Sequence, residues 1–261
     1  MTTFVVAHGA WSAGWAWKKM HPLMRALGYT LVTPTYTGIG ERSHLAHADI
    51  DLNTHITDIL NVLEFEDLRE IILIGHSYGG MVATGVADRA AERISHVVYL
   101  DAFVPRHGDS LLSLTSADNR SRVLEGVRTQ GDGWRIPANP LPPDTRAEDV
   151  AWSTPRRVMQ PLKTWEQPIS LTGAVDTLPR SYIYCKKFGP GDVFRQFADR
   201  AREDERSSQV DRAQADERVR AQVGWTLMEM DASHNPHITV PDELASLLHG
   251  VAKKQPREQL A

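Results

Sequence analysis

The chain has 261 residues, with 29 basic against 33 acidic side chains, a formal net charge of −4 and a single cysteine, Cys185. The length suits one α/β domain with an insertion, and the near-balanced charge excludes a strongly basic nucleic-acid binder as the first interpretation. One cysteine excludes an intrachain disulfide scaffold or a thiolate metal cluster. No run approaches the roughly 18 apolar residues that a membrane span requires, and the first residues lack the basic region of a signal peptide. We therefore expect a cytoplasmic protein that binds neither nucleic acid nor a membrane.

Short apolar runs alternate with segments of helical periodicity along most of the chain. Buried strands are expected at residues 4–7, 30–33, 71–74, 96–100, 182–184 and 225–228. Helices are expected at residues 17–27, 55–63, 81–91 and 243–251, with Gly28 ending the first and Asn53 or Thr54 capping the second. Apolar runs joined by helices indicate a parallel sheet that is covered on both faces. The predicted fold class is therefore α/β, a doubly wound and mostly parallel sheet.

Two stretches break this alternation. Residues 105–179 hold nine of the fifteen prolines and three of the seven tryptophans, without a run typical of a parallel strand. Because such a segment is too long for a loop, we interpret it as a cap inserted between two parts of the core, residues 1–104 and 180–261. Residues 199–220 include 13 charged side chains, seven acidic and six basic. Mixed charge of this density predicts a solvated helix.

The strongest catalytic signal is Gly75–Gly79, which reads Gly-His-Ser-Tyr-Gly and matches G-x-S-x-G. It lies between a predicted strand and a predicted helix, which is the context that a nucleophile elbow requires. Ser77 is therefore the predicted nucleophile, on a strained turn at the carboxyl edge of the sheet. Gly75 and Gly79 are expected where strand and helix pack too closely for a side chain.

A serine nucleophile needs a base, and chain order in this architecture places the histidine last. Of the two histidines after the last predicted strand, His234 is the preferred base, and His237 is expected to line the site or contact the cap. The carboxylate that orients the base has two candidates. Asp101 ends a predicted strand on the sheet edge that carries Ser77 and is preferred. Asp192, the first carboxylate after the next strand, stays open.

Acyl transfer also needs backbone donors for the oxyanion that develops in the transition state. The amide of Tyr78, which follows the nucleophile, is one expected donor. The amide of Ala10 is the other, because Gly9 lets the loop after the first strand turn tightly. Trp11, next to Ala10, is expected to wall the substrate pocket. This chemistry requires neither a metal nor an organic cofactor.

With these motifs the chain resembles the α/β-hydrolase superfamily, in the branch of plant methylesterases, hydroxynitrile lyases and related bacterial esterases. The resemblance spans nearly the whole chain. It rests on His8-Gly-Ala10, Trp15-Ala-Trp17, the Gly-His-Ser-Tyr-Gly elbow and a histidine seven residues before Pro241. It implies that His234, rather than His237, matches the catalytic histidine.

Departures from the patterns of the superfamily disfavour hydroxynitrile lyase, dehalogenase and epoxide hydrolase activity. Its lyases carry a threonine after the histidine of the first loop and a lysine after the catalytic histidine, where this chain has Gly9 and Asn235. Dehalogenases and epoxide hydrolases of the superfamily use an aspartate at the position of Ser77. Phe188 stands where the branch usually has its acid, and members that lack an acid there place it after the preceding strand, at the Asp101 position.

Together these features predict a carboxylic ester hydrolase that works through an acyl-enzyme intermediate. Because the cap forms the pocket walls in this fold and contains tryptophans, the expected partner is a small to medium, mostly apolar ester. One alternative is a lyase, C–C hydrolase or cofactor-free oxygenase on the same scaffold, in which Ser77 only binds substrate. Another is a low-turnover small-molecule binding protein. The resemblance also leaves a homodimer open.

Overall fold

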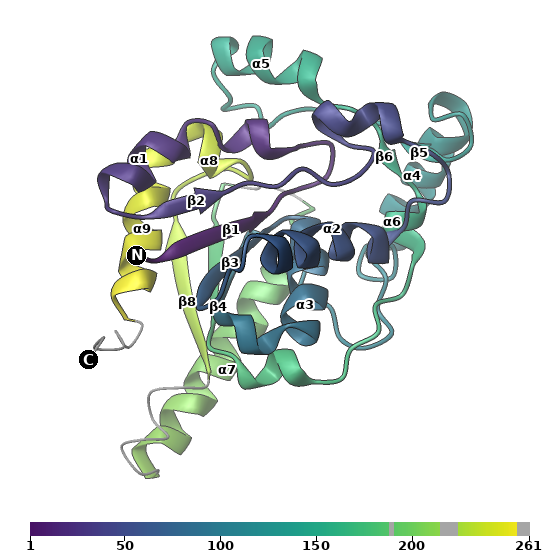
Figure 1. Cartoon of the computed structure of the whole chain (residues 1–261). Helices are drawn as coiled ribbons and strands as arrows, with labels where there is room; N and C mark the ends of the chain where they lie inside the picture. Colours follow the sequence, from purple (N-terminus) through teal and green to yellow (C-terminus); the bar gives the residue numbers. More distant parts are fainter. Residues whose placement is uncertain (188–190, 215–223, 255–261) are drawn as a thin grey trace.

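A computed structural model describes residues 1–187, 191–214 and 224–254 of the chain (Figure 1). Its centre is a six-stranded sheet with the order β2-β1-β3-β4-β7-β8, in which every neighbouring pair is parallel. The strands are β1 (Thr3–Ala7), β2 (Thr30–Val32), β3 (Ile71–His76), β4 (Ile94–Leu100), β7 (Arg180–Cys185) and β8 (Trp225–Met230). The predicted doubly wound parallel sheet is confirmed. From β1 the chain adds β2 on one side of the sheet and β3, β4, β7 and β8 on the other, so the strand order switches between β1 and β3. Doubly wound sheets bind ligands at the carboxyl ends of the strands beside such a switch point.

Helices cover both faces of the sheet (Figure 1). The helices of one face are α1 (Met20–Ala26) and α9 (Pro241–Lys253), and those of the other are α2 (Leu52–Phe65), α3 (Gly79–Arg89) and α7 (Arg195–Gln214). Alternate residues of β1 point to opposite faces, so that Phe4 and Val6 pack toward α1 and α9 while Val5 and Ala7 pack toward α2 and α3. All four side chains are fully buried. Both faces of the strand therefore have to be apolar.

The ends of the first two helices test the local predictions. Gly28, two residues beyond α1, has φ +82, as its predicted place after the helix requires. The expected cap of α2 is wrong, because Asp51 rather than Asn53 or Thr54 precedes the first turn. Its carboxylate accepts a hydrogen bond from the amide of Thr54 at 2.8 Å, and Thr54 Oγ1 accepts one from the amide of Asp51. A capping side chain accepts a hydrogen bond from an amide two or three residues further along the chain. The Asp51 carboxylate does so for the amide of Thr54, whereas the Thr54 hydroxyl does not bond to its own amide.

The charged stretch forms part of α7, in agreement with the predicted helix up to Gln214. The rest of residues 199–220 lies outside the described residues. Arg202 illustrates the solvated character of this helix, since it pairs with Asp199 at 2.5 Å and with Glu229 of β8 at 2.7 Å at the surface. In the part of the chain that is described, no helix combines the length and apolar character needed to cross a membrane.

Residues 105–179, called the inserted segment below, contain helices and one small antiparallel pair of strands but no parallel strand in the described structure. Its elements are α4 (Ala117–Gln130), β5 (Arg135–Ile136), α5 (Ala147–Ser153), β6 (Gln160–Pro161) and α6 (Lys163–Glu166). Its buried apolar side chains, among them Leu111, Trp165 and Ile169, belong to the same cluster as those of α2 and α3. On the other side, α5 contacts the core through Lys19 and Asp149, whose Nζ and Oδ1 are 2.6 Å apart. The inserted segment is thus packed onto the sheet domain from two sides.

Asp88, near the end of α3, holds the end of the inserted segment just before the chain enters β7. Its carboxylate accepts hydrogen bonds from the amides of Thr172, Gly173 and Val175 at 2.6, 2.9 and 3.4 Å, and from the Thr172 hydroxyl at 3.0 Å. Burial raises the pKa of this carboxyl, but these hydrogen bonds outweigh burial and leave the pKa below its ordinary value.

Replacing Asp88 with alanine is expected to lower the free energy of unfolding by about 2–4 kcal/mol, because three amides and a hydroxyl lose their acceptor at a partly buried site. Urea unfolding followed by circular dichroism measures this change. Asp144→Ala is the matched control, since Asp144 is exposed and should change stability by less than about 0.5 kcal/mol. Equal effects of the two substitutions would contradict the anchoring role of Asp88.

Candidate active site

Ser77 lies on the tight turn between β3 and α3, with φ +55. A positive φ is strained for a residue with a side chain, as the prediction of an elbow requires. A Cβ atom at Gly75 would lie 2.8 Å from the Cβ of Ala83, and one at Gly79 only 2.0 Å from the carbonyl oxygen of Ala7. The two glycines therefore let the strand, the helix and the neighbouring strand β1 meet at this point.

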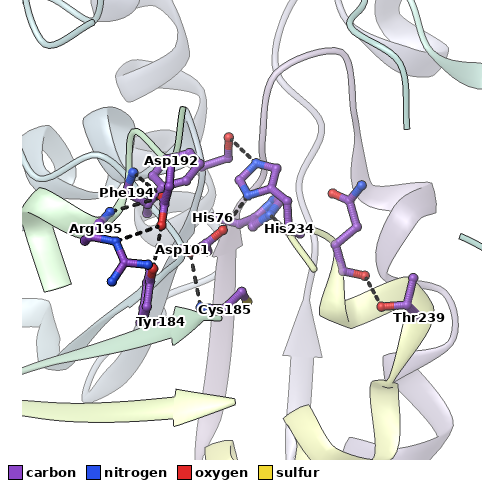
Figure 2. A network of polar contacts seen from close by, with 12 residues as sticks. His76, Asp101, Tyr184, Cys185, Asp192, Phe194, Arg195, His234 and Thr239 are labelled. Carbon is purple, nitrogen blue, oxygen red and sulfur yellow. Dashed lines mark hydrogen bonds and ion pairs between the residues drawn. The ribbon is translucent and has the colours of Figure 1, made fainter. Parts of the chain in front are cut away.

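The structure brings Ser77, His234 and Asp101 together at the carboxyl edge of the sheet, from the turns after β3, β8 and β4. The Nε2 atom of His234 lies 2.9 Å from Ser77 Oγ, and its Nδ1 atom lies 2.7 Å from Asp101 Oδ2. Figure 2 shows the His234 ring facing Asp101. Asp101 is fully buried, and its Oδ1 accepts a hydrogen bond from the amide of Cys185 at 3.2 Å. With Asp101 ionised, Nδ1 donates to the carboxylate and Nε2 is left to accept the proton of Ser77.

Burial sets the protonation state of this group. It lowers the pKa of His234 to about 4, an effect that the charge of Asp192 opposes and that of Arg157 reinforces. Burial also raises the pKa of Asp101, and the amide of Cys185 acts against that rise. At neutral pH the imidazole is therefore uncharged and able to take up a proton.

The structure does not bring Asp192 into this hydrogen-bonded group. Its Oδ2 accepts the Tyr184 hydroxyl at 2.5 Å, and its Oδ1 accepts the amides of Phe194 and Arg195 at 2.9 and 3.1 Å (Figure 2). Asp192 thereby satisfies amides at the start of α7, as a capping residue does. Phe188 lies outside the described residues.

Phe194 is a site residue that the sequence analysis missed. Its ring stacks on the imidazole of His234, with the centroids 4.7 Å apart and the planes at 13°. The amide of Phe194 is held by Asp192, so this carboxylate reaches His234 through an intervening aromatic ring. A phenylalanine at the start of a helix carries no sequence signal for such a contact, although its position two residues after a candidate acid marks the region.

The amides of Ala10 and Tyr78 lie on the two turns that meet beside Ser77. In the described residues, no hydrogen bond uses the amide of Ala10 or that of Tyr78. The loop after β1 passes close to the elbow, because a Cβ atom at Gly9 would lie 3.3 Å from Ser77 Cβ and 2.8 Å from His76 Nδ1. The two amides that the sequence suggests as oxyanion donors are therefore available near the serine.

A buried aromatic network supports the residue after the serine. The Tyr78 hydroxyl lies 2.9 Å from His55 Nδ1, and His55 Nε2 lies 3.1 Å from the carbonyl oxygen of Thr37. Because that carbonyl only accepts, Nε2 carries the proton of His55 and the Tyr78 hydroxyl donates to Nδ1. Tyr36 stacks on His55 at 4.6 Å and lies 3.8 Å from the ring of His8. Sequence reasoning missed this network, for which the tyrosine after Ser77 was the one available signal.

Trp11 joins the loop after β1 to the inserted segment. Its backbone has φ +56, its indole Nε1 donates to the carbonyl oxygen of Ile136 at 2.9 Å, and its ring lies 5.5 Å from that of Trp165. The indole is nearly buried, with 8% of its residue surface exposed. The inserted segment therefore fixes the side chain next to Ala10.

His237 is buried against Trp17 and His76. Its ring stacks on Trp17 at 4.6 Å and 11°, and meets His76 at 4.7 Å. The short helix α8 (Pro236–Thr239) turns this side chain into the core, and its expected role in lining the site or contacting the cap stays a prediction. His76 lies between the two histidines, since it also contacts the ring of His234 at 4.8 Å.

The assembled groups can perform acyl transfer, because a hydroxyl, a neutral imidazole, a buried carboxylate and two unused amides are what that chemistry needs. Among the residues that the structure describes, no group of three or more histidines, cysteines, aspartates and glutamates is arranged to hold a metal ion.

Comparison with known sequences gives relatives that include esterases. The carbendazim hydrolyzing esterase of Nocardioides sp. (strain SG-4G) is 36% identical over 257 residues, which is 95% of this chain and 98% of that protein. Salicylic acid-binding protein 2 of Nicotiana tabacum is 30% identical over 134 residues, which is 50% of this chain and 48% of that protein.

Solved structures share the whole fold. An extracellular alpha/beta-hydrolase from a Paenibacillus species aligns with a TM-score of 0.75 and 22% identity over 98% of this chain and 99% of its own. Tomato methylketone synthase I aligns with a TM-score of 0.71 and 16% identity over 98% and 99% of the two chains. A sequence profile described as "Alpha/beta hydrolase family" matches residues 4–247. The chain belongs to the alpha/beta hydrolase family.

Proposed function

We propose that the protein is a serine esterase that hydrolyses a carboxylic ester through an acyl-enzyme intermediate. The observation that carries this proposal is the hydrogen-bonded group in which His234 lies 2.9 Å from Ser77 Oγ and 2.7 Å from Asp101 Oδ2. A relative that is named as an esterase and aligned over 95% of the chain supports it.

In the first half of the reaction, Ser77 Oγ bonds to the ester carbonyl carbon while its proton passes to Nε2 of His234. The amides of Ala10 and Tyr78 donate to the carbonyl oxygen as it becomes negative. The tetrahedral intermediate collapses when the bond to the alcohol oxygen breaks, and His234 gives its proton to that oxygen. Asp101 stabilises the imidazolium between these two transfers.

Water completes the cycle. His234 takes a proton from a water molecule, whose oxygen bonds to the acyl carbon. The bond between Ser77 and the acyl carbon then breaks, the acid is released, and the proton returns from His234 to Ser77 Oγ. Every proton that His234 takes up is given back, so the enzyme ends as it began.

The inserted segment is proposed to act as a cap over this site. Support comes from Trp165, which lies against Trp11 beside the loop that carries Ala10. Such aromatic walls favour a small to medium, mostly apolar ester. We also propose a cytoplasmic location, on the ground that the one cysteine, Cys185, is a buried free thiol.

A fluorophosphonate probe is expected to label Ser77, with the adduct located by mass spectrometry of the digested protein. Ser77→Ala should abolish both labelling and the hydrolysis of 4-nitrophenyl butyrate, because the substitution removes the proposed nucleophile. A folded but unlabelled wild-type protein would count against the esterase. Labelling without turnover on a panel of esters would favour the binding protein instead.

The two candidate acids can be separated by matched substitutions. Asp101→Asn is expected to lower kcat by about 10³–10⁴-fold, because the amide no longer stabilises the imidazolium or the required tautomer. Asp192→Asn should lower kcat by less than about tenfold, since Asp192 acts on His234 by its charge and through the ring of Phe194, whereas Asp101 is hydrogen-bonded to the imidazole. Steady-state rates on 4-nitrophenyl butyrate measure both, and a change of only a few-fold in Asp101→Asn would reverse the assignment.

The acid side of the pH profile follows from the pKa of His234. A base whose pKa is lowered from 6.5 to about 4 stays neutral until the solution becomes more acidic than usual for a histidine. We expect log(kcat/KM) to remain level well below pH 6.5 and to fall with an apparent pKa near 4. Buffers of constant ionic strength and a substrate that does not titrate there give this value. A fall centred at 6.5 or above would show that His234 is not the desolvated base.

A further inference from the structure

Arg157 is a half-buried cation in the inserted segment whose charge the described structure does not neutralise. It follows a short 3₁₀ turn, η4 (Thr154–Arg156), and its Nη1 donates to the carbonyl oxygen of Asn139 at 2.5 Å. None of the ion pairs formed within residues 1–187, 191–214 and 224–254 includes Arg157. By contrast, Arg42 and Arg93 pair with Asp58 and Glu64 at 3.1 and 2.5 Å.

The guanidinium lies beside the candidate active site. Its Cζ atom is 5.7 Å from the centroid of the Trp11 ring, and Trp11 directly follows the Ala10 amide. The backbone amide of Trp11 contacts the side chain of Gln160, three residues after Arg157, at 3.4 Å. Two residues before Trp11, Gly9 approaches Ser77 so closely that an added Cβ would be 3.3 Å from Ser77 Cβ. The inserted segment thus holds a positive charge next to the loop that flanks the serine.

The carboxylates of the candidate active site are already in use. Asp101 is bonded to His234 and to the amide of Cys185, and Asp192 is bonded to Tyr184 and to amides at the start of α7. Burial lowers the pKa of Arg157, which expresses the cost of removing its charge from water without a counter-ion. An anion from outside the chain would relieve that cost. A guanidinium suits a carboxylate in particular, because its planar donors match the two oxygens.

We propose that Arg157 determines specificity by binding a carboxylate of the substrate, so that the preferred substrates are half-esters. Such a molecule has an apolar body with a scissile ester at one end and a free carboxylate at the other. The apolar body would lie along Trp11 while Ser77 attacks the ester. This inference rests on the proposed esterase function, and the products would be an alcohol and a dicarboxylate.

The test compares methyl half-esters of linear dicarboxylic acids, from succinate to suberate, with methyl esters of monocarboxylic acids of the same chain lengths. We expect the wild-type kcat/KM to be higher for a half-ester than for the neutral ester of the same chain length, at the length that spans Ser77 and Arg157. Arg157→Gln should lower kcat/KM for that half-ester by about tenfold or more, mainly through KM, and that for the neutral ester by less than about threefold. Arg157→Lys, which keeps the charge without the planar fork, should be intermediate.

The neighbouring Arg156 provides a matched control. Its guanidinium also lies over an indole, at 5.6 Å from the ring of Trp152, and its Nη1 also donates to a backbone oxygen at 2.5 Å, but the side chain is exposed. Arg156→Gln should leave both classes of ester within about twofold of wild type. Thermal unfolding of each variant checks that the fold is kept.

Binding without turnover separates the two proposals. In a Ser77→Ala background, calorimetry should detect the half-ester, and adding Arg157→Gln should abolish that binding. A wild-type preference for neutral esters, or an equal loss for both classes in Arg157→Gln, would overturn the carboxylate site while leaving the esterase intact. Binding that depends on Arg157 in a protein that hydrolyses no ester would instead keep the site and reject the esterase.

Discussion

The structure depends on the lack of space where the first turn of α3 crosses the ends of the central strands. A Cβ atom at Gly79 would lie 2.0 Å from the carbonyl oxygen of Ala7, and one at Gly80 would lie 2.0 Å from that of Phe103. The helix is therefore packed against the end of β1 and against the backbone that follows β4. This contact forces the intervening Ser77 into its left-handed conformation and brings it next to the turn that carries Asp101. The geometry of the site is a consequence of backbone packing.

The same close packing controls the charges. His8, His55, His76 and His237 surround the elbow, and burial lowers the pKa of each of them. Neutral rings can stack and accept hydrogen bonds without adding positive charge beside His234. The elbow is thus surrounded by rings that are polar but uncharged. His234 is the imidazole that exchanges protons in the proposed reaction. Two charged side chains, Asp192 and Arg157, do shift the pKa of His234, and they act from the edge of this site.

Much of the fold could be predicted because its signals are local. The apolar run at residues 71–74, followed by Gly-His-Ser-Tyr-Gly, identifies a strand, a turn and a helix within one stretch of chain. The choice of His234 over His237 followed from its place in the loop before the last helix and from the family resemblance, and that of Asp101 over Asp192 from a strand end on the sheet edge of Ser77. The contacts that sequence did not predict join distant residues, as when Phe194 stacks on His234 or Trp11 donates to Ile136. Periodicity describes which face of an element is buried, but it does not describe which side chain will lie opposite.

The carboxylate bonded to His234 comes from the turn after β4, so the turn after β4 and the loop after β7 should differ in how much sequence change they tolerate. The loop after β7 does not have to hold an acid at a fixed distance from the imidazole. What the described part of that region supplies is an aromatic surface, Phe194, whose amide is fixed by Asp192. Stacking tolerates small displacements that a hydrogen bond does not. Insertions, deletions or grafted sequences should therefore be accepted after β7 more readily than after β4, which makes the β7 loop the natural place to reshape the protein around its site.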